Sequence, residues 1–307
     1  MSESTLLFRF IVVAAGDAQP DLRALVASLK PGWPGDRAAL TVVDNGATCN
    51  LDAVTAELSR SSLLRPERNL GYGAAINEAA RQADEPAAWI VACNADLVFE
   101  SDVITRLTSL VEQAPAHVGC IAPRLLDPPQ GIAGADRRTQ PSIGAFPTLR
   151  SLLARRTAPR RTRKYIQTPT RARDVDWATG ACLLIRTSAF AAIEGFDSEF
   201  FLDYEDVDLC RRLHLAGWRV RCEPEWCVTH RSPNAARPIS AGRHVHTRAS
   251  LVRYWAKHRP AWEFHTLGQM MNAASSLRSA QHPLMPAWRS GADTYRMLAR
   301  RMRKEQP

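Results

Sequence analysis

Short apolar runs alternate with amphipathic segments along the N-terminal part of the chain. The apolar runs, rich in β-branched residues, predict buried strands at residues 8–14, 40–43, 89–93 and 118–122, with a short extended piece at 62–64. Between them, helical spacing of apolar residues predicts helices at 21–29, 51–58, 71–83 and 101–111, the last capped by Ser101. Strands that alternate with helices form βαβ units, so we expect an α/β fold with a mostly parallel sheet.

The pattern changes in the second half of the chain. Residues 127–173 are rich in Pro, Gly and Arg and lack periodicity, so we expect an insertion there, either ordered or mobile. Regular patterns then predict a strand at 177–185, a helix from Ser188, a helix at 205–216 that ends at Gly217, strand pieces at 219–222 and 226–229, and a basic helix at 243–258. We therefore divide the chain into a domain at 1–258 and a basic helical C-terminal extension at 259–307.

Charge narrows the classes of function. The 307 residues include 40 Lys+Arg against 31 Asp+Glu, a net charge of +9 that comes almost entirely from arginine. A basic surface favours anionic partners without selecting among them. The densest basic run, at 155–164, has no interleaved aromatic residue, which disfavours nucleic-acid binding. No glycine precedes any lysine, and a P-loop requires a Gly-Lys pair, so P-loop NTPase chemistry is excluded.

The cysteines and the N-terminus indicate the cellular compartment in which the protein is expected. The seven cysteines form no CxxC pair, which favours reduced thiols over a disulfide framework or a zinc site. The N-terminus lacks the long apolar region of a signal peptide, and no apolar run approaches the ~18 residues of a spanning helix. We expect a cytoplasmic protein.

Carboxylates follow two predicted strands, and a third acidic group opens a predicted helix. Asp44 and Asp96 end strands, where open α/β sheets bind their ligands, although each one alone is also an ordinary turn residue. Residues 203–208 contain four acids in six positions, which is more than helix capping requires. A helix dipole keeps a carboxylate ionised while acidic neighbours raise its pKa, a balance that suits a general base.

A glycine-containing turn precedes the helix at 71–83. Gly71 and Gly73 resemble a phosphate-binding loop, but Ile76 stands where a dinucleotide fingerprint has its third glycine. An NAD site is therefore disfavoured. Backbone N–H groups at this helix start remain suited to a diphosphate.

Taken together, these motifs resemble the family 2 glycosyltransferases, in their bacterial rhamnosyltransferase-like branch. The matching segments are VVDNG at 42–46, NLGYGAAIN at 69–77, Asn94-Ala95-Asp96, TGACLLIR at 179–186, GFD at 195–197, FFLDYEDVD at 200–208, Trp218 and Thr229-His230. The resemblance covers roughly residues 8 to 258 and leaves the tail outside. It implies a GT-A (nucleotide-diphospho-sugar transferase) fold: a Rossmann-like, mostly parallel sheet with flanking helices, followed here by a helical C-terminal extension.

The resemblance also implies residue roles. Asp206 is expected to be the catalytic base, with Glu205 beside it. Asp96 is expected to hold Mg²⁺ or Mn²⁺ on the diphosphate, with His230 as a further ligand. The residues expected to bind the nucleotide sugar are Asp44, Asn69, Gly71, Asn77, Asn94, Trp177, Thr179 and Gly180. Among these, Asn94 replaces the aspartate that usually begins the metal motif, and Trp177 suits core packing better than sugar stacking.

The function implied is that of an inverting, metal-dependent glycosyltransferase. It would move a rhamnose-like sugar from a dTDP-, UDP- or GDP-sugar to a glycan, lipid-linked or small-molecule hydroxyl. A non-catalytic nucleotide-sugar-binding relative and a nucleotidyltransferase of similar fold are the alternatives. The basic segments favour peripheral contact with the inner face of a membrane. A homodimer, the linkage and the roles of Arg243, Arg248 and Arg253 are left open, while His214, His244, His246 and His258 are expected at the surface or in helices.

Overall fold

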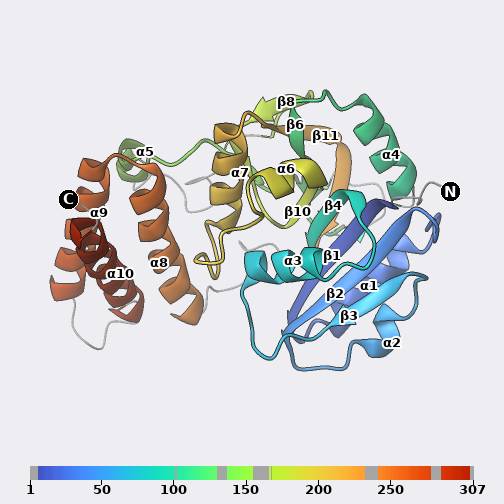
Figure 1. Ribbon diagram of the computed structural model, residues 1–307, viewed down its shortest axis with the longest axis horizontal. Coiled ribbons are helices and arrows are strands. Elements are labelled where there is room, and N and C mark those ends of the chain that lie inside the picture. Colours follow the sequence, from blue (N-terminus) through green and yellow to red (C-terminus); the bar gives the residue numbers. More distant parts are fainter. Residues whose placement is uncertain are drawn as a thin grey trace.

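A mixed sheet forms the centre of the molecule (Figure 1). The computed structural model describes residues 6–100, 102–129, 137–154, 166, 168–231, 241–277 and 285–304. Within these residues the main sheet has nine strands in the order β3-β2-β1-β4-β10-β6-β11-β5, with β8 paired to β11. Its strands are β1 (Leu6–Gly16), β2 (Ala38–Ala47), β3 (Ser61–Leu64), β4 (Ala87–Asn94), β5 (Leu97–Phe99), β6 (Val118–Leu126), β8 (Arg173–Val175), β10 (Cys182–Arg186) and β11 (Arg219–His230).

The strand directions bring many strand ends to one edge. Strands β1 to β4 are parallel to one another, and β6 is parallel to β11. Strand β10 lies between β4 and β6 and is antiparallel to both, so β6 and β11 run in the same direction as β1 to β4. The carboxyl ends of these six strands therefore share one edge, where ligands bind in open α/β sheets.

Helices cover both faces of this sheet. On one face, α1 (Gln19–Leu29), α2 (Asp52–Thr55) and α4 (Val103–Gln113) share a core with alternate strand residues such as Phe10 and Val12. On the other face, α3 (Tyr72–Arg81), α6 (Thr187–Ala192) and α7 (Glu205–Leu215) share a core with Ile11 and Val43. Burial on both faces is the reason that the strands are continuous apolar runs in the sequence.

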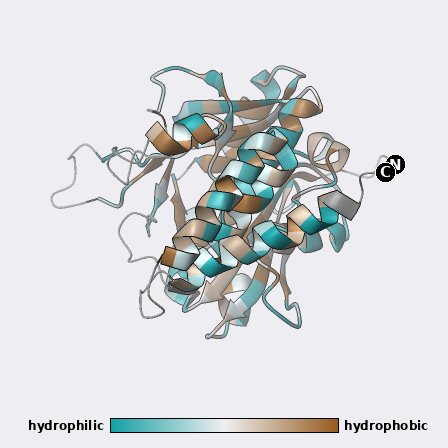
Figure 2. Ribbon diagram, turned by 90° about the vertical axis from the view of Figure 1, so that its left-hand side faces the viewer, coloured by the Kyte–Doolittle hydropathy of each residue, from teal (hydrophilic) through white to brown (hydrophobic). Residues whose placement is uncertain are grey.

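A layer of C-terminal helices lies beside α7, at the left of Figure 1. It consists of α8 (Ala241–His258), α9 (Ala261–Leu277) and α10 (Met285–Lys304). Helix α8 packs against both α9 and α10, so the helices on either side of the predicted boundary at 258 form one layer. Figure 2, which views the molecule from this side, shows hydrophilic and hydrophobic residues mixed along these helices. Trp262, Leu277 and Met297 are exposed.

Part of the predicted insertion docks on this layer and part lies against the sheet. Helix α5 (Leu149–Ala154) is held where the Leu149 N–H donates to Glu263 Oε2 at 3.0 Å. The short strands β7 (Ile143–Gly144) and β9 (Trp177–Ala178) form a second, two-stranded sheet. The basic run at 155–164 lies outside the described residues. No helix in the described part of the chain is long and apolar enough to cross a membrane.

Three predicted elements differ from the structure in detail. The regular structure predicted at 177–185 is divided into two strands, because a turn at 179–181 separates β9 from β10. The two strand pieces predicted at 219–222 and 226–229 form one strand, β11, with a register shift between Glu223 and Cys227. Helix α4 begins at Val103 with Asp102 at its N-cap, and the predicted cap Ser101 lies outside the described residues.

Candidate active site

The register of the sheet places the predicted site residues along its carboxyl edge. Asp44 pairs with Ala14 across β2 and β1, and Asn94 pairs with Val13 across β4 and β1. Adjacent strands lie ~4.8 Å apart, so these two side chains arise on strands separated by about 10 Å. Asp96 follows β4 in the turn that leads to β5, and antiparallel pairing of β5 with β11 sets Leu97 opposite His230.

Asp96 and His230 face each other at this edge. The Oδ1 atom of Asp96 lies 3.3 Å from Nε2 of His230, and their side chains are 19% and 5% exposed. The turn is fixed because the Arg231 N–H donates to the Asp96 backbone oxygen at 2.8 Å. Among the described residues, this buried Oδ1 atom accepts no hydrogen bond. A buried carboxylate oxygen that accepts no hydrogen bond is unfavourable unless something else compensates it. Together with the imidazole nitrogen beside it, this oxygen could ligate a divalent cation.

The protein supplies few ligand atoms to such a cation. The described residues contain no cluster of three or more His, Cys, Asp or Glu side chains able to hold a metal ion. Mg²⁺ commonly takes one or two carboxylates and completes its coordination with substrate phosphates and water. The Asp96–His230 pair therefore fits an ion that is bound together with a diphosphate.

The loop before α3 is fixed by buried amide groups. Asn45, which is 3% exposed, accepts from the Leu70 N–H at 2.7 Å and donates to the Gly71 oxygen at 3.3 Å. Asn69 accepts from the Gly71 N–H at 2.9 Å. Asn45 is not among the site residues predicted from the sequence. Its position directly after an apolar run could have indicated a role at the sheet edge.

Gly71 allows this loop to approach the segment before α7. Its φ is +81°, and an added Cβ atom would lie 2.3 Å from the backbone oxygen of Phe201. The Tyr72 N–H donates to that same oxygen at 3.3 Å. Only glycine satisfies both the left-handed backbone and this close approach.

We expect Gly71→Ala to reduce the free energy of unfolding by more than Gly32→Ala does. Gly32 has a similar φ of +78° but open space around it, so its variant isolates the cost of the backbone conformation, about 1–2 kcal/mol. Overlap with Phe201 adds about 1–3 kcal/mol at Gly71. Urea unfolding followed by tryptophan fluorescence measures both variants. Equal destabilisation of the two variants would show that the loop moves away from Phe201 without a loss of stability.

Asp206 lies at the first turn of α7 and contacts the turn at 179–181. Its Oδ2 atom accepts from the Gly180 N–H at 3.0 Å, and its Oδ1 atom accepts from the Val207 N–H at 2.8 Å. Tyr72 donates its hydroxyl to the Gly180 oxygen from the other side. Burial raises the pKa of the Tyr72 phenol well above its usual value, so this group stays a neutral donor.

The turn at 179–181 also joins Asp206 to the end of β4. The Asn94 N–H donates to the Ala181 oxygen at 3.0 Å, and the Thr179 N–H donates to the Ser142 oxygen at 2.7 Å. The turn thus links the predicted residues: Gly180 contacts Asp206 directly, its neighbour Ala181 contacts Asn94, and Thr179 precedes Gly180 in the chain. Glu205 is buried beside Asp206 at the start of α7.

The other acids of the 203–208 cluster are paired with cations from α7 and α8. Asp203 accepts from Arg243 Nη2 at 2.8 Å and from the Thr247 hydroxyl. Asp208, which is fully buried, contacts Arg212 on α7 and Lys257 and His258 on α8. Mutual repulsion of the acids is therefore relieved. His258, expected at the surface or in a helix, is the last residue of α8, and its side chain is buried against Asp208.

The segment before α7 has an uncommon backbone conformation. Asp203 and Tyr204 have φ values of +63° and +70°, both left-handed. Helix α8 holds this segment, because Ser250 donates to the Leu202 oxygen at 3.0 Å and the His246 ring lies 4.4 Å from that of Phe201. The role of Arg243 was left open by the sequence analysis. Its side chain pairs with Asp203 and so takes part in this contact, and it does not lie on a solvated face.

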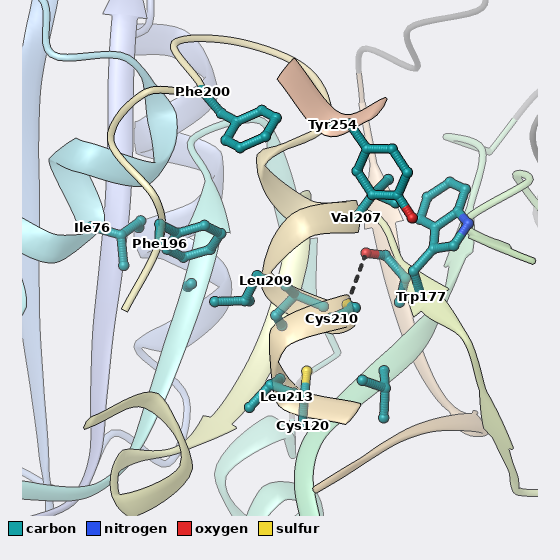
Figure 3. Close-up of a cluster of buried hydrophobic side chains, with 14 of the residues drawn as sticks. Ile76, Cys120, Trp177, Phe196, Phe200, Val207, Leu209, Cys210, Leu213 and Tyr254 are labelled. Carbon is teal, nitrogen blue, oxygen red and sulfur yellow. Dashed lines mark hydrogen bonds between the residues drawn. The ribbon is translucent and has the colours of Figure 1, made fainter. Parts of the chain in front are cut away.

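Two predicted nucleotide-sugar residues have mainly structural contacts. Trp177 is 1% exposed and donates its indole N–H to the Ala145 oxygen at 3.0 Å. Figure 3 shows it within the buried cluster around Val207, Cys210 and Tyr254. This burial corrects the prediction that its ring lines the sugar site, and supports core packing.

Asn77 clamps the loop before the acidic cluster. Its side-chain amide accepts from the Phe196 N–H at 2.8 Å and donates to the Phe196 oxygen at 2.7 Å. Its role at the nucleotide stays a prediction. Asp44 lies 3.8 Å from Arg65 Nε at the outer part of the same edge.

Comparison with known proteins identifies the family. Residues 8–248 match glycosyltransferase-like family 2, and the chain belongs to this family. The N-acetylglucosaminyl-diphospho-decaprenol L-rhamnosyltransferase of Mycobacterium tuberculosis H37Rv is 28% identical over 282 residues, which cover 88% of this chain and 91% of that protein. The predicted resemblance to the rhamnosyltransferase-like branch is confirmed, and the chain is a sugar-transferring enzyme.

Solved structures confirm the GT-A fold. GalNAc-T7 with UDP, GalNAc and Mn²⁺ has a TM-score of 0.62 at 13% identity, covering 100% of this chain and 59% of that chain. Residues 1–349 of Staphylococcus aureus TarS have a TM-score of 0.52 at 16% identity, covering 98% and 92%. At these identities the likeness concerns the fold alone.

Proposed function

We propose that this glycosyltransferase is inverting and metal-dependent, and that it moves a rhamnose-like sugar from a nucleoside-diphosphate donor to an acceptor hydroxyl. One observation carries the proposal. Asp96, which faces His230, closely follows Asn94, whose N–H donates to the Ala181 oxygen at 3.0 Å. The adjacent Gly180 N–H donates to the Asp206 carboxylate, also at 3.0 Å. These contacts support a diphosphate site and a base that are neighbours.

Asp206 is the base in this proposal. It takes the proton of the acceptor hydroxyl while the acceptor oxygen forms a bond to the anomeric carbon. The bond from that carbon to the diphosphate oxygen breaks on the opposite face, and the nucleoside diphosphate leaves with the electron pair. A single displacement of this kind inverts the anomeric configuration. Asp206 lies in the first turn of α7, and Glu205 lies next to it.

Asp96 and His230 are the residues that would hold Mg²⁺ or Mn²⁺. When bound, such an ion supplies positive charge against the charge that develops on the leaving diphosphate. Asp44, Asn69 and the N–H groups at the start of α3 would bind the nucleotide and its phosphates. Asn94, Thr179 and Gly180 would line the side of the site that faces the sugar.

The acceptor in this proposal is a glycan or lipid-linked hydroxyl. The Mycobacterium tuberculosis relative is named for a lipid-diphosphate acceptor. The net charge of +9 favours an anionic carrier of that kind at a membrane surface, and Trp262 and Leu277 are exposed on the C-terminal layer. A water-soluble glycan and a lipid-diphosphate-linked sugar in vesicles, compared at equal concentration, distinguish these acceptors.

Donor binding tests the proposal. Unfolding temperature is measured with dTDP-rhamnose, UDP-sugars and GDP-sugars, each with and without Mn²⁺. We expect one donor class to stabilise the protein in a Mn²⁺-dependent manner, because a ligand at 100 times its Kd adds about 2.7 kcal/mol. Asp96→Asn should remove the Mn²⁺-dependent part. A protein that no donor stabilises in the presence of Mn²⁺ would contradict the proposal.

A further inference from the structure

Gln140, in the segment predicted as an insertion, reaches the candidate metal pair. It is 6% exposed and makes three hydrogen-bond contacts through its side chain. Its nitrogen donates to the backbone oxygens of His230 at 2.8 Å and Leu126 at 3.3 Å. Its oxygen lies 3.0 Å from Nδ1 of His230. The backbone places it there, since the Gln140 N–H donates to the Leu125 backbone oxygen and the Asp127 N–H donates to the Arg138 backbone oxygen, both at 2.8 Å.

These contacts fix which way the Gln140 amide faces. The two carbonyl oxygens of His230 and Leu126 accept only, so the NH₂ end of the amide must face them. Reversing the amide would set its oxygen against two carbonyl oxygens inside the protein. The acceptor end of Gln140 is therefore the end that faces the His230 ring.

The orientation of Gln140 in turn fixes the proton on His230. The amide oxygen has no hydrogen, so Nδ1 of His230 must donate to it. A neutral ring held in this way has its lone pair on Nε2, the atom that lies 3.3 Å from Asp96 Oδ1. Two acceptor atoms held face to face attract a cation between them.

We propose that Gln140 is a positioning residue that holds the His230 ring with its proton on Nδ1, leaving Nε2 to bind a divalent cation together with Asp96. The inference rests on the proposed function, because only a metal-dependent reaction requires Nε2 to bind a cation. It also assigns a role to part of the insertion at 127–173. Hydrogen-bond partners of this kind orient metal-binding histidines, and their loss typically weakens metal binding 10- to 100-fold.

The position of the ring proton tests this directly and needs neither metal nor turnover. Long-range ¹H–¹⁵N spectra of protein labelled on histidine distinguish a proton on Nδ1 from one on Nε2, and His230→Asn assigns the signal. We expect the Nδ1–H form in the unaltered protein. In Gln140→Leu, Nδ1 loses its acceptor, and the proton should move to Nε2, where Asp96 accepts it.

Metal affinity provides the second readout. Free Mn²⁺, counted from its EPR signal during titration with Mn²⁺ alone, should show a Kd 10- to 100-fold higher in Gln140→Leu. Gln113→Leu, on the exposed side of α4, is the matched control and should change neither readout. Gln140→Met, with an unbranched side chain, replaces the leucine variant if circular dichroism shows that the latter is unfolded.

The outcomes separate this inference from the proposed function. A neutral ring with its proton on Nε2 in the unaltered protein would overturn the positioning role. So would an unchanged tautomer together with a Mn²⁺ affinity within twofold of normal in the folded Gln140 variant. If His230 carries the Nδ1 proton as expected but no Mn²⁺ binds even when a nucleoside diphosphate is present, the positioning role stands and the metal-dependent function fails.

Discussion

Asp206→Asn should lower the rate of sugar transfer by about 10²- to 10⁴-fold while leaving donor binding within a few-fold of normal. Asparagine has nearly the same shape and keeps an oxygen that accepts from the Gly180 N–H, which lies 3.0 Å from Oδ2 in the unaltered protein. It cannot take a proton from the acceptor hydroxyl. Initial rates of nucleoside-diphosphate release, with donor affinity measured separately, check this expectation.

A second aspartate provides the control for Asp206. Asp102 stands at the N-cap of α4, on the opposite face of the sheet from α7, so Asp102→Asn changes a helix-start charge outside the site. It should leave the transfer rate unchanged. Near-normal turnover in Asp206→Asn would remove this residue from the role of base. A parallel loss of donor binding would show that the residue acts on structure.

Asp208→Asn should be among the most destabilising single changes in α7. The carboxylate is fully buried, and it contacts Arg212 Nε at 2.7 Å, His258 Nε2 at 2.7 Å and Lys257 Nζ at 2.9 Å. Removing one charge from a buried group of ion pairs leaves its partners uncompensated, which costs about 3–5 kcal/mol. Urea unfolding of both proteins measures the difference in free energy.

The matched control for Asp208 is Asp293→Asn. Asp293 pairs with Arg296 on the exposed surface of α10, with side chains 69% and 47% exposed. Exposed pairs contribute about 0–1 kcal/mol, so this variant should unfold close to the unaltered protein. Equal effects of the two substitutions would show that the α7–α8 contact does not depend on the charge of Asp208.

The effect of Asp208 should also depend on pH. Burial acts to raise its pKa, but the hydrogen bond from His258 and the charges of Arg212 and Lys257 outweigh this, so the pKa is lowered. A lowered pKa stabilises the fold above the unfolded value of about 3.9 and loses this contribution as the pH falls through the folded value. The difference between the unaltered protein and Asp208→Asn should therefore shrink below about pH 4.

The sequence predicted the α/β architecture because the strands are buried on both faces. The run 10–14 contains no polar residue, and the helices between the strands have clear apolar faces. The antiparallel strand β10 was harder to anticipate. Nothing in the residues of the 179–186 segment says that it enters the sheet between β4 and β6 in the reverse direction.

The candidate site was predictable where residues follow strand ends or open helices. Asp44, Asp96 and Asp206 were identified in this way, and the register brings the first two to one edge. Gln140 carried no signal, because its segment has no periodicity and its partner His230 is 90 residues away. The α8 contacts of Asp208 were hidden for the same reason, since His258 resembled an ordinary helix residue.

The anomeric configuration of the product tests the central claim most directly. Transfer is run with the donor that stabilises the protein, Mn²⁺ and an accepted hydroxyl, and the first-formed glycoside is examined by NMR. A single displacement assisted by Asp206 predicts a configuration opposite to that of the donor, in a product whose formation is abolished by Asp206→Asn. Retained configuration, or normal product formation by Asp206→Asn, would contradict this account.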